Sequence, residues 1–191
     1  MIYRHIHGVT VTAQFAREAA LSFRYRLEIV ATDRLVAGKT VCAVMQNPSY
    51  ANEDVADKSV QFMEKLVFAK GLPEFRGVCR LIVVNQFARI QTNGFRGLPE
   101  EIGPRNDLAI HEALLESDIV VLGWGSSNRF EERKALVYSL LEGMSGKTIL
   151  QTRMHPSRGR YEGFIQPFQR HVSKHRPADG VGCVGEKCAS A

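Results

Sequence analysis

The sequence predicts a three-layer α/β domain in which helices cover both faces of a central, mostly parallel sheet of four strands. Short apolar runs of strand length alternate along the chain with segments of helical periodicity, the pattern of parallel α/β domains. The 191 residues are 45% hydrophobic and 24% charged, as in ordinary globular chains with one core. We therefore expect a single domain over residues 1–172, followed by a basic, Gly/Cys-containing tail over residues 173–191.

The amino-terminal residues predict one helix and one strand ahead of the main alternation. Residues 12–21 place apolar side chains at helical spacing and predict a short first helix. Between Tyr25 and Ile29, apolar residues alternate with charged ones, which is the period of a half-buried strand. Residues 33–39, which include Gly38, predict a turn into the next strand.

From residue 40 onward, predicted strands and helices alternate. Four apolar runs of strand length cover residues 40–45, 81–84, 118–122 and 147–151. Three segments of helical periodicity lie between them, at residues 54–70, 104–117 and 130–142. Because wholly apolar strands are covered on both faces, we expect these four strands to run parallel with helices on either side.

The first of these helical segments combines an apolar face with an acidic start. Its apolar side chains share one face and are expected in the core: Val60, Met63, Leu66 and Val67. Phe62 is also expected in the core rather than as a stacking platform for a ligand. Asp54 and Asp57 suit the capping of the first helical turn, and either is an alternative candidate for a catalytic carboxylate.

Amides, hydroxyls, aromatic rings and an imidazole follow the four predicted parallel strands. The strand exits read Gln46-Asn47-Pro48-Ser49-Tyr50, Asn85-Gln86-Phe87, Gly123-Trp124-Gly125-Ser126-Ser127-Asn128 and Met154-His155-Pro156-Ser157-Arg158-Gly159-Arg160. Turn formation explains such residues at any single exit. In open parallel sheets, however, ligands bind outside the carboxyl ends of the strands. The four exits together therefore predict a site at this edge.

Positive charge is concentrated toward the carboxyl end. The formal net charge is +5, and residues 151–191 hold seven Lys or Arg against three Asp or Glu, which accounts for +4 of it. Cationic side chains release counterions when they approach phosphates, so this distribution favours a polyanion such as DNA as partner. A solvated tail that keeps the protein soluble is the alternative interpretation.

Composition also bears on the cellular compartment. No run approaches the roughly 18 apolar residues of a membrane helix, and residues 1–7 lack the layout of a secretory signal. The cysteines are too few and too scattered for a disulfide framework: Cys42, Cys79, Cys183 and Cys188. We therefore expect a cytoplasmic monomer with no membrane partner.

The strand exits resemble the signature loops of the uracil-DNA glycosylase superfamily. Asn47-Pro48-Ser49 and His155-Pro156-Ser157 are similar to its two signature loops, and Val83-Val84-Asn85 resembles its base-reading strand. The resemblance covers roughly residues 40–168 in the right order, and it is closest to an uncharacterised bacterial family related to these glycosylases. It implies the uracil-DNA glycosylase-like fold and a monofunctional DNA glycosylase that hydrolyses an N-glycosidic bond and leaves an abasic site.

The resemblance also implies roles for individual residues. Asn47 would orient the attacking water, and His155 would donate a hydrogen bond to the departing base, so these two are the catalytic candidates. Base-binding candidates at the exits are Gln46, Ser49, Tyr50, Asn85 and Phe87. DNA-binding candidates, which would contact phosphate or fill the space of a flipped base, are Ser126, Ser157, Arg158, Arg160 and Tyr161. The amide of Asn85 suits either a uracil-like or a cytosine-like edge.

Two departures from the superfamily pattern bear on substrate and cofactor. Ser49 stands where uracil-specific relatives have a Tyr against ring position 5, which favours a substituted pyrimidine such as hydroxymethyl- or glucosyl-hydroxymethylcytosine of phage DNA. A role in antiviral defence would follow. Cys42 and Cys79 fall inside predicted strands, so no iron–sulfur cluster is expected. A zinc site formed by tail residues is the weaker alternative to no metal and no cofactor: His171, His175, Cys183 and Cys188.

Two other function classes remain open from the sequence. Asn47 in place of a carboxylate allows a catalytically silent module that binds nucleic acid through the same pocket. An N-glycosidase acting on free nucleosides or nucleotides is the third hypothesis, against which the basic carboxyl-terminal segment argues.

Overall fold

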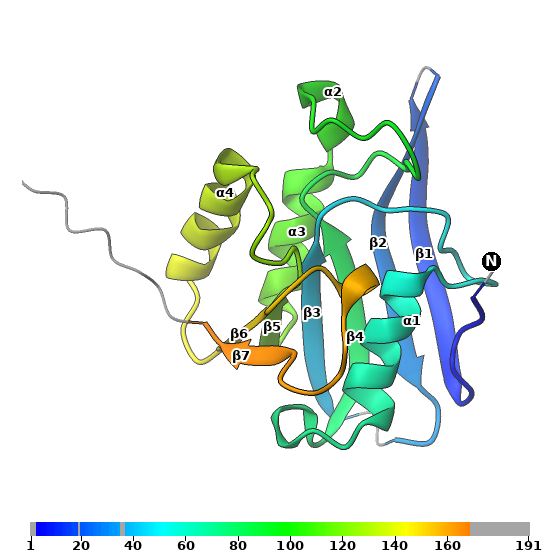
Figure 1. Ribbon diagram of the computed structural model, residues 1–191, viewed down its shortest axis with the longest axis vertical. Helices are drawn as coiled ribbons and strands as arrows, with labels where there is room; N and C mark the ends of the chain where they lie inside the picture. Colours follow the sequence, from blue (N-terminus) through cyan, green and yellow to red (C-terminus); the bar gives the residue numbers. More distant parts are fainter. Residues whose placement is uncertain (1–2, 19, 35–36, 169–191) are drawn as a thin grey trace, which may run out of the picture.

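In the part of the chain that the structure describes, seven strands form one mixed sheet in the order β1-β2-β4-β3-β5-β6-β7 (Figure 1). The computed structural model describes residues 3–18, 20–34 and 37–168. The strands are β1 (Val9–Glu18), β2 (Leu21–Ala31), β3 (Lys39–Met45), β4 (Val78–Asn85), β5 (Ile119–Leu122), β6 (Thr148–Thr152) and β7 (Ile165–Pro167). The α/β class predicted from the sequence is confirmed, but the sheet is larger than the four strands predicted.

Strands β4, β3, β5 and β6, which correspond to the four predicted apolar runs, lie side by side and pair in parallel. Three antiparallel strands extend the sheet at its two edges, with β2 and β1 beyond β4 and β7 beyond β6. Short β7 carries too few apolar residues to stand out in the sequence. The parallel pairing brings the four polar strand exits to the same edge.

The predicted first helix is wrong, because residues 9–18 form the edge strand β1. Its residues alternate between half-buried and exposed, and Val9, Val11 and Ala13 pack against the core. β1 pairs antiparallel with β2 along its whole length. The apolar residues near Phe15 match helical spacing locally, but a long ladder of backbone hydrogen bonds outweighs that weak preference.

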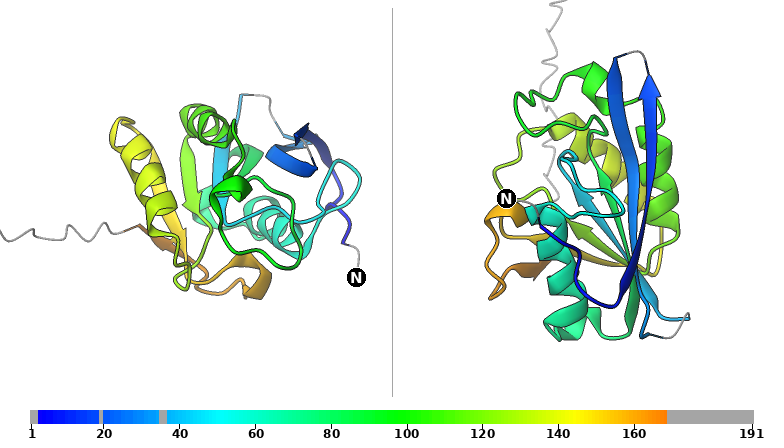
Figure 2. Two further views of the ribbon diagram at one scale, coloured as in Figure 1. Left: turned by 90° about the horizontal axis from the view of Figure 1, so that it is seen from above. Right: turned by 90° about the vertical axis from the view of Figure 1, so that its right-hand side faces the viewer.

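Helices cover both faces of the sheet (Figure 2). The helical elements are α1 (Lys58–Glu64), the π-helical turn η1 (Lys65–Ala69), η2 (Pro73–Phe75), α2 (Pro99–Ile102), α3 (Asn106–Leu115), α4 (Glu131–Glu142) and η3 (Pro156–Arg158). Along β3, Val41, Ala43 and Met45 face α1, while Cys42 and Val44 face α3 and α4. This alternation builds one core on each face of the sheet.

The helix predicted over residues 54–70 begins later than expected. Asp57 is the N-cap of α1, where its Oδ1 accepts a hydrogen bond from the Val60 amide at 2.9 Å. Asp54 precedes the helix, and its amide donates to Asn52 Oδ1, so the capping role predicted for Asp54 is wrong. The predicted buried face is confirmed by Val60, Met63, Leu66 and Val67, and Phe62 is also in the core.

Other residues that the sequence analysis singled out can also be compared with the structure. Trp124 is 6% exposed and packs in the core between the sheet and α4, edge-on to Tyr138, so it is no part of a binding surface here. Cys42 and Cys79 are buried in β3 and β4. The tail from residue 173 and the four residues of the alternative zinc site lie outside the described residues. Within the described ranges, no helix is long and apolar enough to cross a membrane.

Candidate functional site

A cavity of about 270 Å³ lies at the edge of the sheet where the parallel strands end. Its wall is formed by Met45, Asn47, Ser49, Tyr50, Asp57, Lys58, Ser59, Gln91, Thr92, His155 and Ser157. Five of the predicted site residues therefore meet here: Asn47, Ser49, Tyr50, His155 and Ser157. The volume is near the lower end of the roughly 300–1,000 Å³ typical of small-molecule pockets.

The topology explains why these residues converge. β3 lies between β4 and β5 in the sheet. The chain passes from β3 through α1 to β4 on one side, and from β4 through α3 to β5 on the other side of β3. The connections therefore leave β3 in opposite directions, which opens a space at the carboxyl ends of these strands. The loop after β5 approaches the loop after β6 very closely. A Cβ at Gly125 would lie 2.3 Å from the His155 amide nitrogen, and Gly125 has a φ of 76°. Only glycine fits this contact.

The hydrogen bonds of His155 define its proton position. The Ser157 amide donates to His155 Nδ1 at 3.3 Å, and Ser157 Oγ lies 2.9 Å from the same nitrogen. Since an amide N–H only donates, Nδ1 is the acceptor, and the neutral ring carries its proton on Nε2. Burial lowers the pKa of His155 below 6.5, only partly offset by the charge of Asp57. His155 is therefore a neutral donor at physiological pH.

The amide of Asn47 also has a defined orientation. Nδ2 donates to the Gln91 carbonyl at 2.9 Å and to the Pro48 carbonyl at 3.3 Å. Oδ1 is then the amide atom that remains for a water molecule or a ligand. Ser49 Oγ lies 3.2 Å from Thr92 Oγ1, and both residues line the same cavity as Asn47. The loop after β3 and the residues following β4 are thus joined around the cavity.

Asp57 supplies the one carboxylate among the described residues that line the cavity. It is 8% exposed. Burial lowers the pKa of both His155 and Arg24, and the negative charge of Asp57 acts in the opposite direction on each. The hydrogen bond from the Val60 amide to Asp57 Oδ1, which caps α1, holds this carboxylate in place. A fixed, largely buried negative charge beside a polar cavity suits the stabilisation of a cation.

Three predicted base-binding residues do not line the cavity. Gln46 accepts a hydrogen bond from Asn128 Nδ2 at 3.3 Å, in a network that includes Gln86. Phe87 is 2% exposed and packs edge-on against Phe95 and Phe130, so in this structure its ring is not free to stack on a base. Asn85 is fully buried in β4, where it pairs with the cavity-lining residue Met45 of β3.

The predicted DNA-binding residues fall into two groups. Arg158 and Arg160 are exposed next to His155 and are available to phosphate, and exposed Ser126 donates to the Arg153 carbonyl at 3.1 Å. Tyr161 stacks flat on Phe62, with ring centroids 4.5 Å apart, and Lys70 Nζ lies 4.3 Å from the centre of the Tyr161 ring. A ring held by these two contacts is not free to fill the space of a flipped base.

Sequence reasoning missed five residues of the cavity wall: Met45, Lys58, Ser59, Gln91 and Thr92. Gln91 and Thr92 lie in the long loop after β4, which carries no periodic pattern. Buried Glu101 organises the end of this loop, because its Oε2 accepts hydrogen bonds from the amides of Arg96, Gly97 and Leu98. The acidic start of α2 after Pro99 is the one sequence signal for this arrangement.

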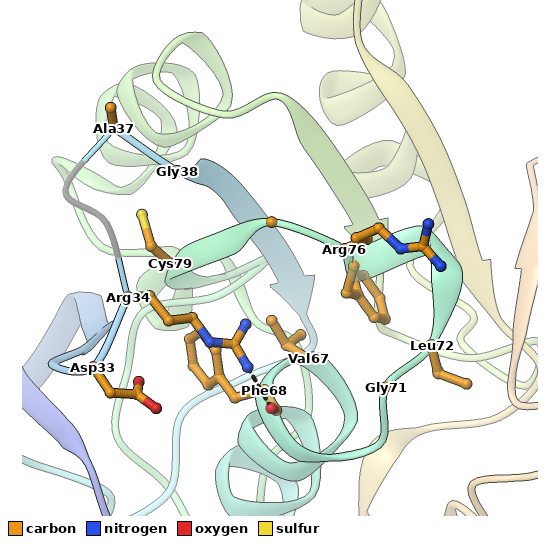
Figure 3. Close-up of a pocket in the computed structure, with 12 residues that line it drawn as sticks. Asp33, Arg34, Ala37, Gly38, Val67, Phe68, Gly71, Leu72, Arg76 and Cys79 are labelled. Atoms are coloured by element: carbon orange, nitrogen blue, oxygen red, sulfur yellow. Dashed lines mark hydrogen bonds between the residues drawn. The ribbon is translucent and has the colours of Figure 1, made fainter.

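A larger cavity of about 690 Å³ lies at the opposite edge of the sheet, where β3 and β4 begin (Figure 3). There Arg34 donates to the carbonyls of Phe68 and Val78, and its guanidinium lies 5.4 Å from the Phe68 ring centre. This cavity contains none of the predicted site residues. We therefore assign the site to the cavity at the carboxyl ends of the parallel strands.

No cluster of three or more His, Cys, Asp or Glu side chains that could hold a metal ion occurs within residues 3–18, 20–34 and 37–168. The polar groups of the cavity are mainly amides and hydroxyls, with one imidazole, one carboxylate and one ammonium group. They are suited to hydrogen bonding and charge stabilisation.

A comparison with known protein families gives a match to most of the chain. The family model described as "Protein of unknown function (DUF1643)" matches residues 24–157, which is more than half of the chain. The chain belongs to this family. The DUF1643 match begins at Arg24 and ends at Ser157, so it spans every residue that lines the cavity. No curated protein and no solved structure matches the chain.

Proposed function

We propose that this protein is a cytoplasmic DNA glycosylase that removes a modified pyrimidine and leaves an abasic site. One observation supports this most: a single cavity contains a neutral histidine with a donor on Nε2, an amide whose oxygen is unoccupied, and a buried carboxylate. They are, respectively, His155, Asn47 and Asp57. Hydrolysis of an N-glycosidic bond needs a donor for the departing base, a group that orients water, and a negative charge near the sugar.

In the proposed reaction the bond between sugar C1′ and the ring nitrogen breaks, and its electron pair stays on the base. Asn47 Oδ1 accepts a hydrogen bond from the water that attacks C1′. The Asp57 carboxylate stabilises the positive charge on the sugar and accepts the proton that the water loses. His155 Nε2–H donates to a carbonyl oxygen of the base, where negative charge accumulates, and the base then takes up a proton from solvent.

DNA is proposed as the substrate because of the charge beside the cavity. Arg158 and Arg160 are exposed directly after His155, and Arg153 is also exposed at this end of β6. Phosphate contacts from such residues position a duplex without reading its sequence. A base inside a duplex cannot reach a cavity of this size, so the nucleotide must be flipped out of the stack.

The test uses oligonucleotides that each contain one uracil, cytosine, 5-hydroxymethylcytosine or glucosylated 5-hydroxymethylcytosine. After incubation with the protein, hot alkali cleaves every abasic site. Strand cleavage only after alkali, absent in the Asn47→Ala/His155→Ala variant, supports the proposal. Binding without cleavage would instead identify a binding module. Release of bases from free nucleosides alone would identify a nucleoside N-glycosidase.

Ser49 is proposed to admit substituents at ring position 5, because its small side chain lines the cavity. Ser49→Tyr adds a ring, and overpacking costs about 1–3 kcal/mol even where a site can relax. We expect at least tenfold slower single-turnover excision of a bulky substituted base, with a smaller effect on uracil, since tenfold corresponds to about 1.4 kcal/mol. Thr92→Ser, which only removes a methyl group from the cavity wall beside Ser49, is the control. Equal effects on both bases would contradict this role.

A further inference from the structure

Arg24, at the amino-terminal part of β2, is a buried cation without an ion-pair partner among the described residues. It is 1% exposed, and it donates from Nη1 to the Ala51 carbonyl at 2.8 Å and from Nη2 to Asn85 Oδ1 at 3.3 Å. Burial lowers the pKa of Arg24 to about 10, so it stays charged at neutral pH. A buried charge is costly to maintain without an ion-pair partner.

A bulge in β2 aims Arg24 toward the site. The pairing of β1 with β2 runs from Gln14 opposite Arg26 to Phe15 opposite Arg24, so Tyr25 is the extra residue. Strict alternation would place Arg24 with Arg26, which pairs with Glu28 and Glu116 on the α3 side. The bulge reverses this and puts Arg24 on the side of the first exit loop. Bulges often re-aim side chains next to active sites.

Arg24 also determines the orientation of the Asn85 amide. A guanidinium can only donate, so the amide atom that it contacts must be the oxygen. Asn85 Nδ2 then points elsewhere. Among the residues that the structure describes, neither this buried atom nor Arg24 Nε has a hydrogen-bond partner. Two unpaired donors therefore occur in one buried cluster. Buried polar groups without partners are rare and often mark a functional site.

This cluster lies next to the cavity. Asn85 pairs with Met45 across β4 and β3, and both side chains lie on the α1 side of the sheet. Met45 lines the cavity, and adjacent strands are only about 5 Å apart. The charge of Asp57, also in the cavity wall, acts on Arg24 as it does on His155. Met45 is unbranched and changes rotamer readily, so its movement would open the donors to a bound base.

We propose that Arg24 is a positioning residue that turns the N–H groups of Asn85 toward the bound base, so that the site selects a pyrimidine with a carbonyl oxygen at ring position 4. A carbonyl oxygen accepts hydrogen bonds from Asn85 Nδ2 and Arg24 Nε. A 4-amino group is itself a donor, so these two donors would face it without an acceptor. The contacts strengthen as the departing base becomes anionic. This inference rests on the proposed function, and it replaces the substituted cytosine expected from the sequence with a substituted uracil-type base.

The first experiment compares excision of 5-hydroxymethyluracil and 5-hydroxymethylcytosine from matched oligonucleotides. We expect the wild-type kcat/KM to favour 5-hydroxymethyluracil at least tenfold, and Arg24→Met to lower this preference severalfold by freeing the amide to rotate. Arg24→Lys should lower it less. Arg26→Met, on the other face of β2, should leave it unchanged. An unchanged preference in a folded Arg24→Met variant, or a wild-type preference for the cytosine base, would overturn the inference.

A second measurement is independent of turnover and of the Arg24 variants. The side-chain amide signals of Asn85 in a ¹H–¹⁵N NMR spectrum are assigned by their loss in Asn85→Asp. Excess free uracil should shift these signals in the wild-type protein, and excess cytosine should not. Equal shifts, or no shift with either base, would overturn the role of Arg24. A uracil-specific shift in a protein that excises no base would support that role while the proposed glycosylase activity fails.

Discussion

His155 shows how two contacts on one ring nitrogen define a chemical role. The Ser157 amide and hydroxyl both lie at Nδ1, so the proton of the neutral ring is on Nε2. Burial disfavours the imidazolium and lowers the pKa of the side chain. The hydrogen bond from the neutral ring to the base becomes stronger as negative charge develops on the base, and His155 does not have to change its protonation state first. The role of Ser157 in this arrangement is to orient His155.

We predict that His155→Ala lowers the excision rate about a hundredfold, as loss of one donor to an oxyanion does, with little change in duplex binding. His7→Ala, an exposed histidine outside the cavity, should have no effect. The wild-type rate should also stay constant as pH falls through 6.5, the ordinary histidine value, and decrease only below it, because the folded pKa is lowered. A wild-type rate in His155→Ala, measured in single turnover, would remove His155 from the mechanism.

At the scale of elements, the site depends on how closely the loops after β5 and β6 approach each other. Gly125 and Gly146 provide a matched pair, because both have a φ of 76°. Alanine at either position is strained by roughly 1–2 kcal/mol. A Cβ at Gly125 would also meet the His155 amide nitrogen at 2.3 Å, whereas a Cβ at Gly146 has nothing within 4 Å. The steric effect at the site is therefore separable from backbone strain.

We predict that Gly125→Ala lowers the melting temperature more than Gly146→Ala and, unlike Gly146→Ala, displaces the His155 loop. Thermal unfolding gives the stability comparison. Chemical-shift changes of the backbone amides of residues 153–155, 157 and 158 report the displacement. Excision by Gly125→Ala should fall at least tenfold, while Gly146→Ala keeps the wild-type rate. Similar behaviour of the two variants would mean that the close approach of Gly125 to His155 does not constrain the site.

A second contact between distant parts of the chain joins the amino-terminal segment to α1. His5 Nδ1 lies 2.5 Å from Glu64 Oε1, Nε2 lies 2.9 Å from the Asn52 carbonyl, and Glu64 is fully buried. Burial acts to lower the pKa of His5, but the hydrogen bonds to Glu64 and Asn52 and the charge of Glu64 outweigh it, so the pKa is raised. Both ring nitrogens face acceptors, which suits the imidazolium.

A raised folded pKa gives this contact a defined pH dependence. Its stabilisation should be complete below the unfolded value of about 6.5 and should be lost as pH rises through the higher folded value. We predict that His5→Ala destabilises the protein by about 3 kcal/mol at pH 5.5, as loss of one partner of a buried pair does, and by less at pH 8.5. Denaturant unfolding at the two pH values tests this. A loss of unfolding free energy that is equal at the two pH values, or larger at pH 8.5, would contradict this prediction.

At the scale of the whole molecule, the positive charge next to the cavity decides how DNA would be held. Arg158 and Arg160 are exposed and belong to the basic carboxyl-terminal segment. We predict that Arg158→Gln and Arg160→Gln each weaken duplex binding and reduce the salt dependence of the binding constant by about one charge. Arg129→Gln, exposed after β5 and away from the cavity wall, is the control. If fluorescence anisotropy titrations give the same salt dependence as for the wild-type protein, the two arginines face solvent and do not contact phosphate.

The sequence by itself determined the α/β class, the parallel strands β3, β4, β5 and β6, and the edge at which their polar exits meet. These features depend on local patterns, since wholly apolar runs are buried on both faces and parallel strands end at one edge. Asn47, Ser49 and His155 were predicted in this way, and they meet in one cavity.

The tertiary structure alone decided which polar residues face that cavity. β1 forms a strand because β2 offers it a complete hydrogen-bonding partner, which overrides the local helical spacing. The rings of Phe87 and Tyr161 pack against Phe130 and Phe62, which lie far from them in the sequence. Arg24 reaches Asn85 only because a bulge reverses the alternation of β2. Such contacts depend on long-range packing, and neither the composition nor the periodicity of a segment contains them.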